Sequence, residues 1–247
     1  MTEVRTRQDR SLPERRSRRW VGATVAMVLA WMAVLIGVGT LLGGPLAAVI
    51  DRDNAWSVEF EEERTPLLDE VTHWWSTSAD TAVIIGTALV VGLVMRVVWG
   101  RWVEPLLLWA AVALQSSMFL TTTLLVSRER PSVEKLDPAP PTSSFPSGHT
   151  GASTALYLSI GLLLASRVRG RAGRVAVVAL LLLVPLGVAV SRLYRGMHFP
   201  TDVLFGALNG TVAVLIVRQA VLGWREDDAA GADRHDRSDS ASGTNRS

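Results

Sequence analysis

The 247-residue sequence contains no cysteine and a single lysine, and the absence of cysteine removes several classes of function. Without cysteine the chain cannot form a disulfide, use a thiolate as a nucleophile or bind a metal through cysteine. The phosphate-binding loops GxxxxGK[ST] and GxGxxG are missing, as is the zinc motif HExxH. The formal net charge is only +2, so the charge balance gives little support for nucleic-acid binding.

Apolar residues make up 49% of the chain, and they are concentrated in long runs. A helix needs about 20 apolar residues to cross the hydrocarbon core of a bilayer. The runs predict an all-α protein, a polytopic bundle of six transmembrane helices within residues 20–223, the fourth and fifth being short. The predicted spans are residues 21–42, 81–99, 105–126, 150–165, 175–190 and 201–222.

Polar segments flank this predicted membrane domain at both ends. Residues 1–19 contain seven arginines and predict a basic tail. A cleaved signal peptide is the alternative, but the run at 21–42 is longer than the roughly 7 to 15 apolar residues of a signal core. Residues 224–247 are rich in Asp, Arg, Ser, Gly and Ala, which predicts a disordered tail.

The connection between the first two spans, residues 51–79, is acidic. Thr65 followed by Pro66 predicts the start of a short helix, because Thr is a good N-cap and Pro fits the first helical position. Apolar residues then recur at helical spacing, which predicts a helix lying in the membrane interface. The acidic run at 59–63 is interpreted as a solvated loop face and not as a metal site. The apolar positions are Leu67, Leu68, Val71, Trp74 and Trp75.

Arginine is concentrated in three segments that six spans would place on one side of the membrane: residues 1–19, 96–101 and 167–174. Cytoplasmic loops carry an excess of positive charge. We therefore expect a multi-pass cell-membrane protein with both termini in the cytoplasm. The loops at 51–79, 127–148 and 191–200 would then face the outside.

The last of these outer segments, residues 191–202, brings together three chemically useful side chains. Asp202 follows His198 by four residues and could reach back to the imidazole if a helix begins near Pro200. A carboxylate on one ring nitrogen fixes the tautomer and leaves the other nitrogen free to attack or to take a proton. Arg192 adds a permanently charged guanidinium, whose parallel N–H donors suit phosphate oxygens.

The loop at 127–148 leads directly into the fourth span and would bring a second set of groups to the same face. It contains Arg130, and it ends in Ser147, Gly148 and His149 where the helix is expected to begin. Free amides at a helix N-terminus attract anions, and glycine lets the backbone approach a ligand closely. Two arginines, an amide cradle and two histidines together predict a phosphate site with a nucleophile and a general acid.

These residues resemble the type 2 phosphatidic acid phosphatase superfamily, whose three-part signature is KxxxxxxRP, PSGH and SRxxxxxHxxxD. The second and third parts are complete here, at residues 146–149 and 191–202. The first part keeps Arg130 but has Thr123 where the family has lysine. Arg128 and Lys135 are candidates to supply the missing charge.

The resemblance implies that His198 attacks phosphorus to form a phosphohistidine, that Asp202 orients it, and that His149 protonates the leaving oxygen and later activates water. Arg130, Arg192 and the amides near Ser147 and Gly148 would hold the phosphate. The expected reaction is hydrolysis of a phosphoric ester or a diphosphate, with no metal or other cofactor.

The expected partners are the membrane and a lipid phosphate or pyrophosphate, of the undecaprenyl pyrophosphate or phosphatidate type; no nucleic acid is expected. Two alternatives remain open at this stage. A lipid phosphotransferase would pass the phosphoryl group from the same histidine to an acceptor other than water. A non-catalytic membrane protein would bind the anion and turn over nothing. Haloperoxidase activity does not fit, because the superfamily's haloperoxidases are soluble.

Overall fold

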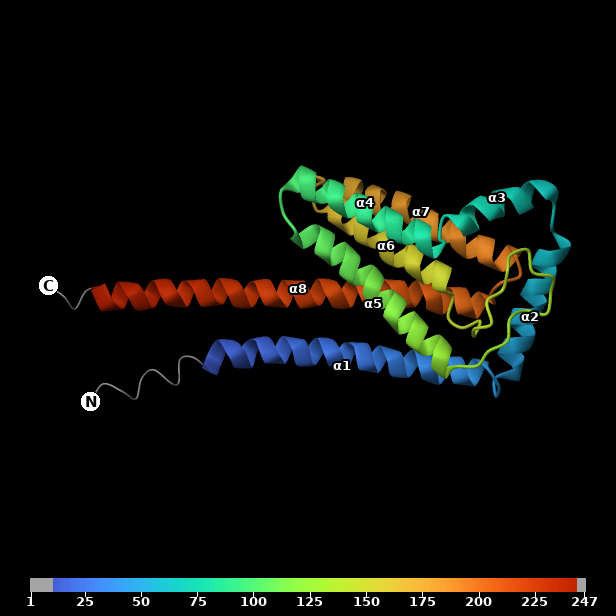
Figure 1. The fold of residues 1–247 in the computed structure, drawn as a ribbon, viewed down its shortest axis with the longest axis horizontal. Coiled ribbons are helices and arrows are strands. Elements are labelled where there is room, and N and C mark those ends of the chain that lie inside the picture. Colours follow the sequence, from blue (N-terminus) through green and yellow to red (C-terminus); the bar gives the residue numbers. More distant parts are fainter. Residues whose placement is uncertain (1–10, 244–247) are drawn as a thin grey trace. The chain divides into compact units, whose positions relative to one another are not determined.

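The structure is a computed structural model that describes the backbone of residues 11–243 and, of the side chains, those of residues 20–46 and 49–221. Every regular element in this range is an α-helix, which confirms the predicted all-α class (Figure 1). The elements are α1 (Ser11–Leu42), α2 (Ala47–Glu62), α3 (Pro66–Thr77), α4 (Thr81–Trp99), α5 (Val103–Leu125), α6 (Gly148–Ala165), α7 (Arg171–Tyr194) and α8 (Pro200–Gly243).

The chain forms two compact units, and each is described by itself. The larger unit, Trp31–Leu215, contains every residue discussed below as part of a site. The smaller unit joins the described residues up to Ala30 to those from Ile216 onward. Within it, α1 begins at Ser11, inside the predicted basic tail, and α8 continues to Gly243, where the sequence predicted disorder from residue 224. Residues 1–10 and 244–247 lie outside the described part.

In the part of the chain that the structure describes, five helices are long and apolar enough to cross a membrane: α1 from Trp20, α4, α5, α7 and α8 as far as Val221. The predicted fourth span, α6, is not among them, so the count of six remains a prediction. Helix α6 is 18 residues long, and its buried face carries small and polar residues such as Gly151, Ser153 and Thr154. It packs against α5 and α7, so its surroundings are largely protein. Small residues allow neighbouring helices to approach closely.

Polar contacts join helices from distant parts of the sequence inside the larger unit. The indole nitrogen of Trp31 on α1 donates to Oδ1 of Asn209 on α8 at 3.0 Å. The Asn209 amide in turn donates to the main-chain oxygen of Gln115 on α5 at 3.3 Å. Asn209 and Gln115 are fully buried, and a buried amide requires such partners.

The acidic connection contains two helices, α2 and α3, where the sequence predicted one. The predicted start at Thr65 and Pro66 is correct, because the Thr65 side chain accepts from the Leu68 amide and Pro66 is the first residue of α3. The acidic run at 59–63, interpreted as a loop face, forms the last turn of α2 and its C-cap and is largely solvated. Helix α3 packs on α7 and exposes apolar side chains, and its interfacial position remains a prediction. The exposed residues are Leu67, Leu68, Val71 and Trp74.

Helix α8 meets the N-terminus of α6 at very close range. The Ser147 amide, just before α6, donates to the Asp202 carbonyl at 2.9 Å. A Cβ atom on Gly206 would lie 2.5 Å from the Ser147 carbonyl oxygen. Main-chain atoms cannot move aside as a flexible side chain can, so this position requires glycine.

This contact predicts a stability difference between two glycine substitutions in helices. Gly206→Ala should lower the free energy of unfolding by about 1 to 3 kcal/mol, the usual cost of overpacking. Gly86→Ala in α4 is the matched control, because its Cβ would meet no atom within 4 Å. It should leave stability unchanged or raise it by up to about 1 kcal/mol, since alanine favours helix over glycine. Thermal unfolding of both variants in one detergent measures the difference, and equal melting temperatures would contradict this account of the α6–α8 contact.

Candidate functional site

His198 lies in the short connection between α7 and α8 and is buried. Its Nδ1 is 2.8 Å from the main-chain oxygen of Ser144, and a carbonyl can only accept, so Nδ1 carries the proton. In the neutral ring Nε2 is then unprotonated and can act as a nucleophile. Burial lowers the pKa of His198 to about 4, and the nearby Arg192 charge acts in the same direction. The imidazole is therefore neutral at physiological pH.

Asp202 sits in the first turn of α8 and is fully buried. The sequence predicted that it could reach back to the imidazole, and its Oδ2 lies 3.7 Å from His198 Nδ1, close to the ring but beyond hydrogen-bonding distance. Oδ2 instead accepts from the Phe199 amide at 2.9 Å and from the Ser144 hydroxyl. Because the Ser144 carbonyl holds His198, Asp202 acts on the imidazole through Ser144 and through the start of α8.

Arg128 is buried, and its guanidinium is paired with two carboxylates. Its guanidinium donates to Asp202, to Thr201 at 2.7 Å and to Asp53 of α2 at 2.7 Å. The sequence suggested Arg128 or Lys135 as a replacement for the missing phosphate-binding lysine. The structure places Arg128 between two acids and Lys135 among exposed residues, and neither lines the cavity around His198.

Arg192, near the C-terminus of α7, does line that cavity and is anchored by Asp137. Its Nη1 donates to Asp137 Oδ2 at 2.7 Å and to the Ser76 hydroxyl at 2.5 Å. Arg195 pairs with the other carboxylate oxygen at 2.7 Å. Burial acts to raise the pKa of Asp137, but the Arg195 hydrogen bond and the Arg192 charge outweigh it and hold the pKa below its usual range. Asp137 therefore stays ionised and keeps the Arg192 side chain in place.

Arg130 is the second arginine on the cavity wall. Its Nη1 donates to the Met197 carbonyl, one residue before His198, at 2.7 Å. Within the described residues its Nε has no hydrogen-bond partner. The guanidinium thus has donors left for an anion beside the imidazole.

The turn at Ser147 and Gly148 begins α6, as predicted. The Ser147 side chain caps the helix by accepting from the Thr150 amide, while its own amide is used by the Asp202 carbonyl. The next amides, of Gly148 and His149, belong to the first turn, where a helix supplies no internal acceptor. Gly148 lines the cavity, and a Cβ there would lie 2.8 Å from the Phe119 ring.

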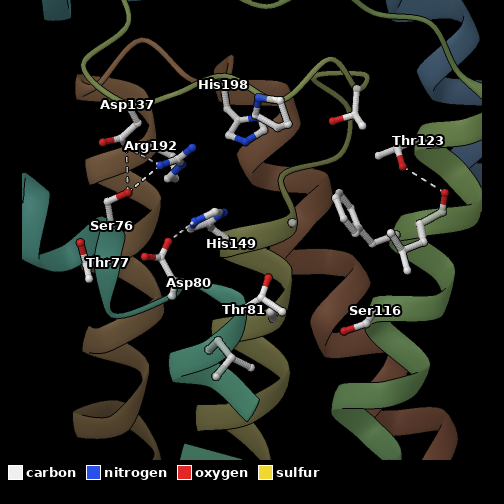
Figure 2. A pocket seen from close by; sticks show the side chains of 18 of the residues that line it. Ser76, Thr77, Asp80, Thr81, Ser116, Thr123, Asp137, His149, Arg192 and His198 are labelled. Carbon is white, nitrogen blue, oxygen red and sulfur yellow. Dashed lines mark hydrogen bonds and ion pairs between the residues drawn. The ribbon is translucent and has the colours of Figure 1, made fainter. Parts of the chain in front are cut away.

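His149 faces the same cavity and has a partner that the sequence analysis did not identify. Its Nε2 is 3.1 Å from Oδ1 of Asp80, the residue before α4 (Figure 2). Figure 2 also shows His198 and Arg192 above this pair, with Asp137 and Ser76 beside the arginine. Both histidines and Arg192 therefore border one space.

That space is a cavity of about 760 Å³ with a polar end and an apolar end. His198, His149, Arg130 and Arg192 surround the polar end. Thr123, at the position of the family's lysine, also lines it. The apolar wall comes from α4 and α5 and includes Ile84, Ile85, Val112, Phe119 and Leu120.

Ser144, Asp137 and Asp80 are the site residues that sequence reasoning missed. Asp80 carried a usable signal, because it immediately precedes an apolar helix and is therefore an N-cap candidate. Asp137 and Ser144 lie in an irregular loop, where no periodicity shows which way a side chain points.

Solved structures with the same fold include two membrane phosphatases. The first is the transmembrane PAP2 type phosphatidylglycerolphosphate phosphatase from Bacillus subtilis, with a TM-score of 0.68 and 23% identity over 79% of this chain and 94% of that one. The second is LpxE from Aquifex aeolicus, with a TM-score of 0.54 and 22% identity over 66% of this chain and 92% of that one. No curated protein sequence matches the chain.

The family comparison covers most of the helices and loops that build the cavity, with α3 outside it. The model of the PAP2 superfamily matches residues 79–226, which is more than half of the 247 residues. This range includes all three parts of the signature, with Thr123 as the departure. The chain is a member of the PAP2 superfamily and has the helical fold of its membrane phosphatases.

Proposed function

We propose that this protein hydrolyses a lipid phosphate or pyrophosphate through a phosphohistidine on His198. The observation that carries the proposal is the orientation of His198, whose Nδ1 is held by the Ser144 carbonyl so that Nε2 is the free nitrogen. The same cavity is lined by Arg130 and Arg192, which supply positive charge, and by His149, which is the proposed proton donor. Phosphoryl transfer needs mainly this positioning and charge neutralisation.

In the proposed reaction His198 Nε2 forms a bond to phosphorus as the bond to the leaving oxygen breaks. His149 gives its proton to that oxygen. Water then attacks the phosphohistidine, His149 accepts a proton from the water, and the bond from nitrogen to phosphorus breaks to release phosphate. Arg130, Arg192 and the amides of Gly148 and His149 hold the non-bridging oxygens throughout.

The shape of the cavity supports a lipid substrate. Its polar end would hold the phosphate, and its α4 and α5 wall offers apolar side chains such as Ile84, Val112 and Leu120 to the lipid tail. A water-soluble ester would gain nothing from that wall. Phosphate release by the purified protein, measured over isoprenyl and glycerolipid phosphates, tests the activity. A transferase would instead release little phosphate until an acceptor alcohol is added.

The two histidines should respond differently to replacement by alanine. His198→Ala should abolish turnover of every substrate, because no phosphoenzyme can form. His149→Ala should slow hydrolysis of an alkyl phosphate by roughly 10² to 10⁴-fold, the usual contribution of general acid catalysis. An aryl phosphate with a good leaving group should lose much less in the first step, and labelled enzyme should accumulate if hydrolysis then stalls.

Acid-quench trapping of enzyme labelled from ³²P substrates separates the two roles. His73→Ala is the matched control, because His73 is on the α3 side of the cavity and has no assigned role. A phosphoenzyme in His198→Ala would reject the proposed nucleophile. A His149→Ala enzyme equally inactive on both substrates, with no trapped intermediate, would reject the proposed acid.

Activity should survive EDTA, because two arginines and the helix amides already face the proposed phosphate position. Vanadate should inhibit, since it can adopt the five-coordinate geometry of the transferring phosphorus beside His198. Phosphate release before and after chelation, with and without added Mg²⁺, measures the first effect. Loss of activity that Mg²⁺ restores would show that protein cations alone do not supply the charge.

We propose that the site faces the outside of the cell membrane and that both termini are cytoplasmic, since the three arginine-rich segments would share one side. Because the natural chain has no cysteine, single cysteines report accessibility directly. Glu63→Cys after α2 and Arg169→Cys between α6 and α7 both replace exposed residues. An impermeant thiol reagent should label only position 63 in intact cells and both positions in lysed cells. Labelling of position 169 alone in intact cells would reverse the orientation.

A further inference from the structure

Asp80 occupies an N-cap position but does not act as a cap. An aspartate at this position normally accepts from an amide two or three residues further on. The Asp80 carboxylate makes no such bond to α4, and its Oδ1 lies instead 3.1 Å from His149 Nε2. Because a carboxylate only accepts, Nε2 must carry a proton toward it. The pair fixes one nitrogen of the imidazole and leaves Nδ1 as the second proton site.

A general acid held as His149 is held by Asp80 is useful for one type of leaving group. When a phosphate monoester is cleaved, the departing alkoxide is strongly basic and needs a proton from His149. When a diphosphate is cleaved at its terminal phosphorus, the departing group is itself a phosphate. It leaves without a proton, but its negative charge has to be stabilised by cations.

The described charges around the cavity favour cleavage of a phosphate monoester over cleavage of a diphosphate. Arg130 and Arg192 are its arginines, and Arg192 is already bonded to Asp137. Asp80 and Asp137 also line the cavity, so these four side chains sum to zero formal charge. Thr123 takes the place of the signature lysine and brings no charge. A second phosphate beside His149 would therefore lie near the Asp80 carboxylate, whose charge offsets that of the protonated His149.

We infer that Asp80, through its pair with His149, makes this site select lipid monophosphate esters over lipid diphosphates. The inference rests on the proposed phosphatase function and narrows its substrate. Asp80 is a positioning residue in this scheme: it holds His149 for protonation of an alkoxide, and its charge repels a second phosphate. His198 Nε2 bonds to phosphorus, the ester oxygen takes the His149 proton and leaves as an alcohol, and water completes the cycle.

The test compares two substrates with the same diacylglycerol tail, phosphatidate and diacylglycerol diphosphate, using the full-length protein in detergent. The wild type should have the higher kcat/KM for phosphatidate. Asp80→Asn should lower kcat for phosphatidate by roughly 10-fold or more, a part of the roughly 10² to 10⁴-fold contributed by the acid itself. Hydrolysis of the diphosphate should be unchanged or faster. Asp80→Glu should recover part of the phosphatidate activity, because it keeps the carboxylate.

Three further variants make the result specific. Asp51→Asn in α2 is the matched control, since Asp51 is exposed and does not line the cavity, and it should change neither rate. Adding Asp80→Asn to His149→Ala should cause no further loss on phosphatidate if Asp80 acts through the imidazole. Thr123→Lys should raise diphosphate hydrolysis by adding the missing cation.

The outcomes that overturn the inference differ from those that overturn the proposed function. Equal losses on both substrates in Asp80→Asn would assign Asp80 a purely structural role. No loss on phosphatidate, or a wild-type preference for the diphosphate, would reject the selectivity. If the wild type releases phosphate from neither substrate and forms no phosphoenzyme, the proposed function fails as a whole.

Discussion

The buried charge of Asp202 is the constraint on which the rest of the site depends. A carboxylate removed from water is tolerated only when charged and hydrogen-bonding partners surround it. Asp202 receives the Arg128 guanidinium, the Ser144 hydroxyl and the Phe199 amide. These partners come from the loop before α6 and from the start of α8, so satisfying one charge brings together the two segments that carry the candidate catalytic histidines. The Ser144 carbonyl then holds His198, so the position of the proposed nucleophile depends on the position of Asp202.

The arginines near the cavity divide into two kinds for the same reason. Arg128 and Arg195 are buried against carboxylates and serve the architecture. Arg130 and Arg192 line the cavity, one held by the Met197 carbonyl and the other by Asp137. An arginine that is only half satisfied by protein can offer its remaining donors to phosphate oxygens. The arginines of this region thus include both structural cations and candidates for phosphate binding.

Much of the fold and part of the site could be predicted from the sequence, because each correct prediction rested on a local pattern. Apolar runs predicted most of the long helices, and Thr65 with Pro66 predicted the start of α3. The structure places His198, His149, Arg130 and Arg192 around one cavity, while their roles remain proposals. The sequence predicted a short fourth span but did not predict that α6 would fall outside the candidate spans, since packing against α5 and α7 allows a helix to carry small polar residues. It also did not predict the pairs of Arg128 with Asp53 or of His149 with Asp80, because each joins residues about 70 positions or more apart, and no single-sequence pattern encodes such contacts.

The bridge from Asp53 through Arg128 to Asp202 has a consequence for how the protein is made. Synthesis runs from the N-terminus, so the α2 carboxylate and the Arg128 cation both leave the ribosome well before Asp202. Asp202 of α8 is thus the last of the three charged residues to be synthesised, and in the final structure it pairs with an arginine that also holds Asp53. The last helix of the larger unit is thereby matched to its place by charge as well as by shape. A nascent chain that stops before α8 leaves Arg128 with one of its two carboxylate partners, Asp53, and without Asp202.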